Sequence, residues 1–119
     1  MDELSTASRT RVIEVSEGRT DEWFVSAPDL GLPEAGLDDL AGGDPAENAA
    51  AVRSVLEGEA GPRRDLVLIN SAAAIYAGGG AADLAEGLRL AAEAVDSGAA
   101  AGVLDRLVAE SGRLGAGGR

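Results

Sequence analysis

The 119-residue sequence contains no cysteine, no histidine and no lysine. The absence of cysteine excludes disulfides and thiolate nucleophiles, and the absence of both cysteine and histidine excludes the usual zinc sites. Histidine is also the commonest general base in enzymes, so catalysis that depends on an imidazole is excluded as well. Any metal that this chain binds must therefore be a hard cation held by oxygen ligands.

Positive charge is scarce too. The chain has ten arginines and 21 aspartates and glutamates, which gives it a net charge of −11. A nucleic-acid-binding surface needs clustered cations, and these arginines are scattered. The sequence has no apolar run near the ~20 residues that span a membrane, and no basic, apolar signal at its start. We therefore expect a soluble cytoplasmic protein with neither nucleic-acid nor membrane partners.

Large apolar side chains are few. The hydrophobic fraction is 45%, but 24 residues are alanine, and the aromatic residues are limited to Trp23, Phe24 and Tyr76. Burial of apolar area stabilises by only about 25 cal/mol per Å², and alanine contributes little area. The sequence thus predicts a thin core and a chain that depends on a partner or on further sequence.

The amino-terminal part of the chain alternates with a period of two. In residues 10–25 the apolar and polar side chains alternate on both sides of Glu17-Gly18, a glycine-containing two-residue turn. This pattern is typical of a β-hairpin. An isolated hairpin is only marginally stable in water, so we expect the two strands to extend a larger sheet.

The rest of the chain is predicted to be mostly helical. Residues 26–43 contain too many prolines and glycines for a long element, and we expect one short helix there, at residues 34–40. The clearest helix start follows. Asp44 is the N-cap, Pro45 is the first helical residue, and Glu47, three residues after the cap, completes a capping box. This helix is expected to end at Gly58.

Three further helices are predicted. One follows Pro62 and ends at residues 78–80, although Leu66 to Ile69 is also compatible with a buried strand. The next starts at the Asp83 cap and stops at residues 97–98, and the last covers residues 100–111. Residues 113–119 are expected to form a disordered tail. The predicted fold of this chain is a β-hairpin followed by four to five Ala-rich α-helices.

Two glycine-rich turns resemble phosphate-binding loops only superficially. After Gly42 and Gly43, the carboxylate of Asp44 occupies the place of an anion at the helix start and would repel a phosphate. The glycines at 78–80 are not followed by the lysine and hydroxyl residue of a P-loop. Both turns are therefore interpreted as structural.

Adjacent acidic residues are the remaining candidates for a site. They occur at 2–3, 21–22 and 38–39, and most such pairs in an acidic chain are solvated surface. Asp2 and Glu3 differ because the hydroxyl-rich residues 5–8 follow them. Neighbouring carboxylates do not easily chelate one ion, but each can reach one of two Mg²⁺ ions or their bound waters. The pair Arg63-Arg64 is expected to be solvated or ion-paired.

Several segments, taken in order, resemble the C-terminal part of anthranilate phosphoribosyltransferases. The stretch from Gly42 to Asn48, followed by Asn70 and by Asp96-Ser97-Gly98, is the most specific part of this resemblance. The matching segments are residues 1–5, 9–10, 11–25, 29–32, 41–49, 68–74 and 94–100.

The resemblance implies a function in tryptophan biosynthesis. Enzymes of this family transfer phosphoribose from PRPP to the amino group of anthranilate and release pyrophosphate, with Mg²⁺ as cofactor. The resemblance implies that Asp2 and Glu3 are metal ligands, and no ligand role is carried over to residues 42–48. Residues 1–112 would be the C-terminal segment of an α/β phosphoribosyltransferase domain whose complete form is a homodimer.

The same resemblance implies that the chain is inactive alone. It lacks the amino-terminal helical domain and the Gly-Thr-Gly-Gly-Asp loop that binds PRPP in the family. Two alternatives stay open. One is phosphorolysis of pyrimidine nucleosides, a related activity in the same fold class. The other is a non-catalytic helical interaction module, or a decayed gene fragment, which the thin core and the unpaired hairpin would fit.

Overall fold

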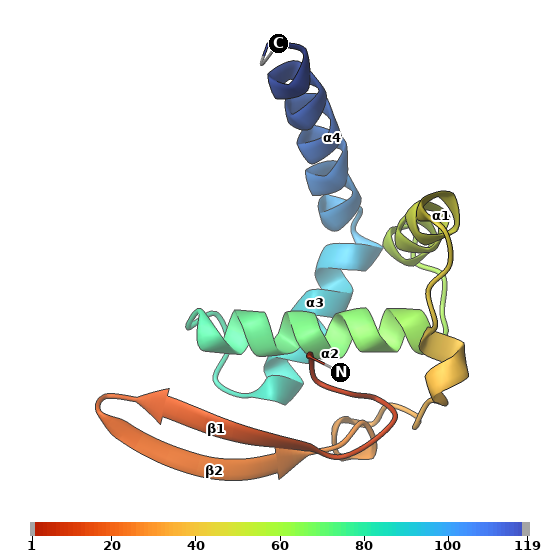
Figure 1. The fold of residues 1–119 in the computed structure, drawn as a ribbon. Helices are drawn as coiled ribbons and strands as arrows, with labels where there is room; N and C mark the ends of the chain where they lie inside the picture. Colours follow the sequence, from red (N-terminus) through yellow and green to blue (C-terminus); the bar gives the residue numbers. More distant parts are fainter. Residues whose placement is uncertain (1, 118–119) are drawn as a thin grey trace.

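The computed structural model describes residues 2–117 as a hairpin followed by four α-helices (Figure 1). The central helix α2 is crossed by α3, while the hairpin lies along one side and α4 projects away. The elements are β1 (Thr10–Ser16), β2 (Arg19–Val25), the 3₁₀ helices η1 (Pro28–Leu30) and η2 (Leu37–Leu40), α1 (Pro45–Leu56), α2 (Pro62–Ala77), α3 (Leu84–Asp96) and α4 (Ala99–Gly117).

The hairpin has the predicted turn. Strands β1 and β2 pair antiparallel with Ser16 opposite Arg19, and Glu17 and Gly18 between them have φ values of 50° and 75°. Two positive φ values in a two-residue loop match the right-handed twist of the strands. Among residues 2–117 these two strands pair only with each other, so their extension into a larger sheet stays a prediction.

The helix starts follow the predicted local rules. The Asp44 carboxylate accepts a hydrogen bond from the Glu47 amide at 2.9 Å, and the Glu47 carboxylate accepts one from the Asp44 amide at 2.8 Å. The Asp83 carboxylate caps α3 by accepting from the Glu86 amide at 2.8 Å, while the Glu86 carboxylate accepts from the Ala82 amide at 2.7 Å. Such caps satisfy amides that have no partner within the helix.

The structure corrects one prediction for the helices and settles an alternative between helix and strand. The helix expected at residues 34–40 is only the 3₁₀ turn η2, because Gly36 is extended and the Asp39 carboxylate accepts a hydrogen bond from its amide, starting the turn there. The stretch from Leu66 to Ile69 lies inside α2 and is not a strand.

The core is thin, as the composition predicts. Among residues 2–117 only nine hydrophobic residues are buried, and three of them are alanines. Helices α2 and α3 cross where Gly87 meets the backbone of Ala72: an added Cβ on Gly87 would lie 2.7 Å from the Ala72 carbonyl oxygen. The buried residues are Val25, Ala27, Val55, Leu68, Ile69, Ala72, Leu84, Ala91 and Val95.

Helix α4 is longer than predicted. Residues 113–117, which were expected to be part of a disordered tail, are helical, and residues 118–119 of that expected tail lie outside the described residues. No proline interrupts the stretch, and the Arg113 guanidinium pairs with Glu110 one turn earlier. None of the α4 residues is buried.

The described chain is more extended than a compact domain. Its radius of gyration is 16.1 Å, against about 13.5 Å for a compact domain of this length. The difference comes from α4 and the hairpin, which project from the α2–α3 pair (Figure 1). Over residues 2–117, no helix has the length and apolar character that crossing a bilayer would require.

Candidate functional site

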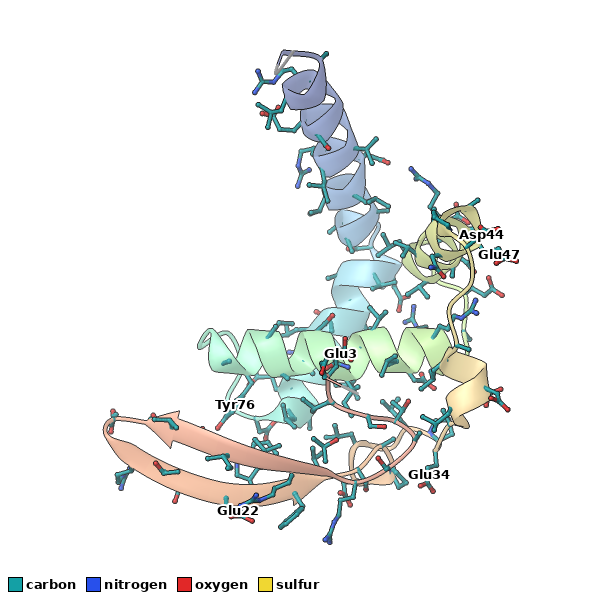
Figure 2. All side chains as sticks on the ribbon, in the orientation of Figure 1. Glu3, Glu22, Glu34, Asp44, Glu47 and Tyr76 are labelled. Atoms are coloured by element: carbon teal, nitrogen blue, oxygen red, sulfur yellow. The ribbon has the colours of Figure 1, made fainter. Side chains whose placement is uncertain are left out.

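The acidic pair Asp2-Glu3 lies against the middle of α2, where Figure 2 shows Glu3. Both side chains are exposed. The next residue, Leu4, makes two hydrogen bonds with the side chain of Asn70. Its amide donates to the Asn70 Oδ1 at 2.9 Å, and its carbonyl oxygen accepts from the Asn70 Nδ2 at 2.9 Å. One side-chain amide therefore holds the backbone immediately after the carboxylate pair.

The helix fixes the orientation of this amide. The Asn70 Nδ2 also donates to the Leu66 carbonyl oxygen, one turn earlier in α2, at 3.0 Å. Both hydrogens of the amide nitrogen are thus in use, which determines which end of the group faces the Leu4 amide. The neighbouring residues Leu68 and Ile69 are 5% and 0% exposed, so this part of α2 is anchored in the core.

The hydroxyl residues after the pair do not form an open ligand set. Ser5 is 8% exposed and its Oγ accepts a hydrogen bond from the Ala7 amide. Thr6 is fully buried, and its hydroxyl has no hydrogen-bond partner among residues 2–117. These residues shape the backbone of the segment, and Ser8 is the exposed hydroxyl of the group.

One carboxylate of each of the other two acidic pairs serves the local structure, as do the acidic residues at the start of α1. Glu22 forms an ion pair with Arg11 across the hairpin, with Nε and Oε1 2.8 Å apart. Asp39 starts η2, and Asp44 with Glu47 caps α1. Figure 2 shows Glu22, Asp44 and Glu47 on other elements, away from Glu3. Within residues 2–117, no three side chains of the types His, Cys, Asp or Glu are grouped to hold a metal ion.

The paired arginines are also engaged with the protein. Arg63 donates to the Ala41 carbonyl oxygen at 3.0 Å, which ties the turn before α1 to α2. Arg64 forms an ion pair with Asp96 at the end of α3, with Nη1 and Oδ1 2.9 Å apart. The expectation that these two arginines are solvated or ion-paired is confirmed for Arg64 by its ion pair, and Arg63 is exposed to solvent.

A polar cluster between the hairpin and α2 was not foreseen from the sequence. The carboxylate of Glu14 accepts a hydrogen bond from the Trp23 indole at 3.0 Å and another from the Tyr76 hydroxyl. The hydrogen bond to Glu14, aided by burial, raises the pKa of Tyr76 above its ordinary value. The available signal was the acidic residue on the strand face that also carries Val12 and Trp23.

Asn70 was part of the family resemblance, but the sequence assigned it no role. A further signal was its position as a polar residue directly after the apolar stretch from Leu66 to Ile69. Its partner lies 66 residues earlier in the chain. Pairing of this kind depends on the tertiary fold, so periodicity alone does not reveal it.

Comparison with known proteins identifies the family. A model described as "Glycosyl transferase family, a/b domain" matches residues 1–101. The chain belongs to this family. The match covers the acidic pair, the hairpin, Asn70 and the first three α-helices, so the candidate site lies wholly within the family's domain.

Similar relatives are anthranilate phosphoribosyltransferases, which confirms the resemblance found in the sequence. The enzyme of Parvibaculum lavamentivorans is 52% identical over 109 residues, which cover 92% of this chain and 32% of the enzyme. Anthranilate phosphoribosyltransferase 2 of Streptomyces coelicolor is 52% identical over 106 residues, covering 89% of this chain and 32% of the enzyme.

A solved structure agrees with the fold. The crystal structure of anthranilate phosphoribosyltransferase from Thermus thermophilus superimposes with a TM-score of 0.82 at 41% identity, covering 92% of this chain and 32% of that one. The predicted architecture, a hairpin followed by helices from an α/β fold, is thereby confirmed. The chain spans about a third of the length of the relatives it matches.

Proposed function

We propose that this chain contributes the Asp2-Glu3 segment to an anthranilate phosphoribosyltransferase that uses PRPP and Mg²⁺. The observation that carries the proposal is the placement of two exposed carboxylates on a backbone held against α2. Its wider support is the similarity to enzymes of that name over 92% of the chain.

The donor set fits Mg²⁺. This cation prefers carboxylate oxygens, keeps several of its waters, and is commonly held by one or two carboxylates together with substrate phosphates. Asp2 and Glu3 supply two such carboxylates and remain open to solvent. When bound, the metal would neutralise charge on the pyrophosphate group of PRPP.

The proposed reaction requires little acid–base catalysis from the residues of this chain. The amino nitrogen of anthranilate forms a bond to the ribose C1 of PRPP, the bond from C1 to pyrophosphate breaks, and the amine loses a proton. Because the transition state carries positive charge on the ribose, positioning and charge neutralisation matter most. A chain without histidine, cysteine or lysine can contribute to such a site.

We further propose that the chain is inactive alone. Its net charge of −11 repels the phosphates of PRPP. Its glycine-rich turns at Gly43 and Gly79 lie at the start of α1 and the end of α2, where they form helix boundaries and not a phosphate-binding loop. The test mixes the pure chain with PRPP, Mg²⁺ and anthranilate and follows the fluorescence of anthranilate. No decrease is expected, and turnover by the chain alone would contradict the proposal.

The site is tested in a chimera, in which this chain replaces the matching segment of the Parvibaculum lavamentivorans enzyme. Asp2→Asn is expected to raise the Mg²⁺ concentration needed for half-maximal activity by about tenfold or more, because a ligand charge is lost. The matched control is Asp21→Asn, another exposed aspartate, which lies in β2 near the turn of the hairpin. Equal behaviour of the two variants would remove Asp2 from the site.

A non-catalytic interaction module is the second candidate. It is favoured by the exposed apolar side chains of α4, among them Val103 at 55% and Leu107 at 63% exposure. The chimera separates the two candidates, because an interaction module would not restore transferase activity. Assay of the chimera with pyrimidine nucleosides and phosphate tests the related phosphorolysis.

A further inference from the structure

We infer that Asn70 is a positioning residue that sets the metal-binding geometry of Asp2 and Glu3 through the backbone of Leu4. The inference rests on the proposed function, because it concerns how those two carboxylates are held. Asn70 itself does not contact the metal. It acts through the main chain that carries the ligands.

The Asn70 side chain pairs with the backbone of Leu4 as a residue of a neighbouring β-strand would. The Asn70 amide offers an acceptor to the Leu4 amide and a donor to the Leu4 carbonyl, both at 2.9 Å. Two parallel hydrogen bonds fix the rotation of the Leu4 peptide groups as well as their position. The peptide that links Glu3 to Leu4 is therefore oriented by α2.

The anchoring of Asn70 makes it a rigid reference. Its third hydrogen bond, to the Leu66 carbonyl, restrains the side-chain rotamer. The helix beneath it is fixed by Ile69 and Ala72, which are fully buried. A metal site is only as well defined as the groups that support its ligands.

Other hydrogen bonds hold the segment further along. The Ser5 amide donates to the Thr10 Oγ1 at 3.1 Å, and the Ala35 amide donates to the Thr6 carbonyl at 3.0 Å. Both contacts lie on the carboxyl side of Leu4. Loss of the Asn70 contact would leave Asp2 and Glu3 attached to a backbone first held at Ser5.

The chain contains a matched control for this contact. Asn48 pairs with the backbone of Gly43 in the same way, with its Oδ1 accepting from the Gly43 amide at 2.8 Å and its Nδ2 donating to the Gly43 carbonyl at 3.0 Å. This second contact lies at the start of α1, away from Glu3 (Figure 2, near Asp44 and Glu47).

The experiment uses the chimera defined above, with Mn²⁺ as a paramagnetic probe and pyrophosphate as the anion. Electron paramagnetic resonance of free Mn²⁺ measures binding without any need for turnover. Asn70→Asp keeps the acceptor for the Leu4 amide and removes both donors. It is expected to raise the dissociation constant of Mn²⁺ in the presence of pyrophosphate by about tenfold. Asn48→Asp should change it by less than about twofold.

Thermal unfolding of the same variants separates positioning from general stability. Asn70→Asp loses two donated hydrogen bonds, to the Leu4 and Leu66 carbonyl oxygens, and Asn48→Asp loses one, to the Gly43 carbonyl oxygen. Both variants should therefore melt at a lower temperature, while only Asn70→Asp should weaken Mn²⁺ binding. If Asn70→Asp does not fold, Asn70→Ala takes its place, since it removes the contact without adding a charge beside two carbonyl oxygens. The expected change in Mn²⁺ binding is the same.

Asp2→Asn, measured in parallel, distinguishes the ways in which the inference can fail. If Asp2→Asn weakens Mn²⁺ binding and the Asn70 variants do not, the positioning role is wrong and the proposed metal site stands. If Asn70→Asp and Asn48→Asp weaken binding equally, the effect is one of stability and the inference is also wrong. If Asp2→Asn itself leaves binding unchanged, both the metal site and the positioning role are overturned.

Discussion

At the scale of single residues, the hydrogen bond between Tyr76 and Glu14 links the hairpin to α2. Tyr76→Phe removes only the hydroxyl and is expected to lower the melting temperature at neutral pH, because the carboxylate loses a donor. The raised pKa of Tyr76 means that the folded state favours the neutral phenol. The stabilisation is therefore complete below the unfolded tyrosine pKa of about 10 and is lost as the pH rises through the folded value.

The measurement is a series of melting curves of both proteins between pH 7 and pH 11. The difference in melting temperature between wild type and Tyr76→Phe should be constant up to about pH 9 and shrink above pH 10. Glu14→Gln gives an independent check, since it replaces the charged acceptor and should reduce the difference already at pH 7. A difference that persists unchanged at pH 11 would contradict the role assigned to this hydrogen bond.

At the scale of elements, the crossing of α2 and α3 depends on the absence of a side chain at Gly87. An added methyl group would lie 2.7 Å from a backbone oxygen of Ala72, which cannot move aside as a side-chain end could. Gly87→Ala is therefore expected to lower the free energy of unfolding by about 3 kcal/mol, the cost of overpacking at a helix contact. Urea denaturation followed by circular dichroism measures it.

A second glycine in a helix serves as the control. Gly112 in α4 is exposed, and a Cβ added there would have no heavy atom within 4 Å, so Gly112→Ala should instead raise the helix stability, by about 0.5–1 kcal/mol. Opposite signs at the two positions identify steric contact as the cause. A loss of stability at both would indicate that the effect at Gly87 is not specific to the crossing.

The boundaries of most elements could be predicted because their signals are local. The caps at Asp44 and Asp83 and the turn at Gly18 each depend on residues within a few positions of one another. The prediction failed where a local signal was weak. Glycines at 112, 115 and 117 favoured an early end to α4, and no stop signal as strong as proline was present to enforce it.

At the scale of the whole molecule, the sequence indicated the candidate carboxylates but not what holds them. Asp2 and Glu3 were found through a resemblance of motifs, whereas the contact with Asn70 joins positions 66 residues apart. The same holds for Tyr76 and Glu14, which are 62 residues apart. Contacts of this range follow from how the helices and the hairpin pack, and no periodicity within either partner segment encodes them.

The arrangement of the whole molecule predicts that α4 contributes little to folding of the isolated chain. No residue of α4 is buried, and its contact with the core is made near Ala100, which packs against the cluster around Leu68. Its ion pair between Arg53 and Asp105, at 3.7 Å, is exposed and worth at most about 1 kcal/mol. A chain ending at residue 102 should therefore melt within a few degrees of the 119-residue chain.

The same truncation should reduce exposed apolar surface. It removes Leu107 and Leu114, which are 63% and 59% exposed, so binding of a hydrophobic dye such as ANS is expected to fall. A comparison variant, Val15→Thr on the outer face of the hairpin, replaces one methyl group of a side chain that is 73% exposed by a hydroxyl and should reduce dye binding by less. A large drop in melting temperature on truncation would show instead that α4 folds back onto the α2–α3 pair in solution, because only burial of its apolar face could supply that stability.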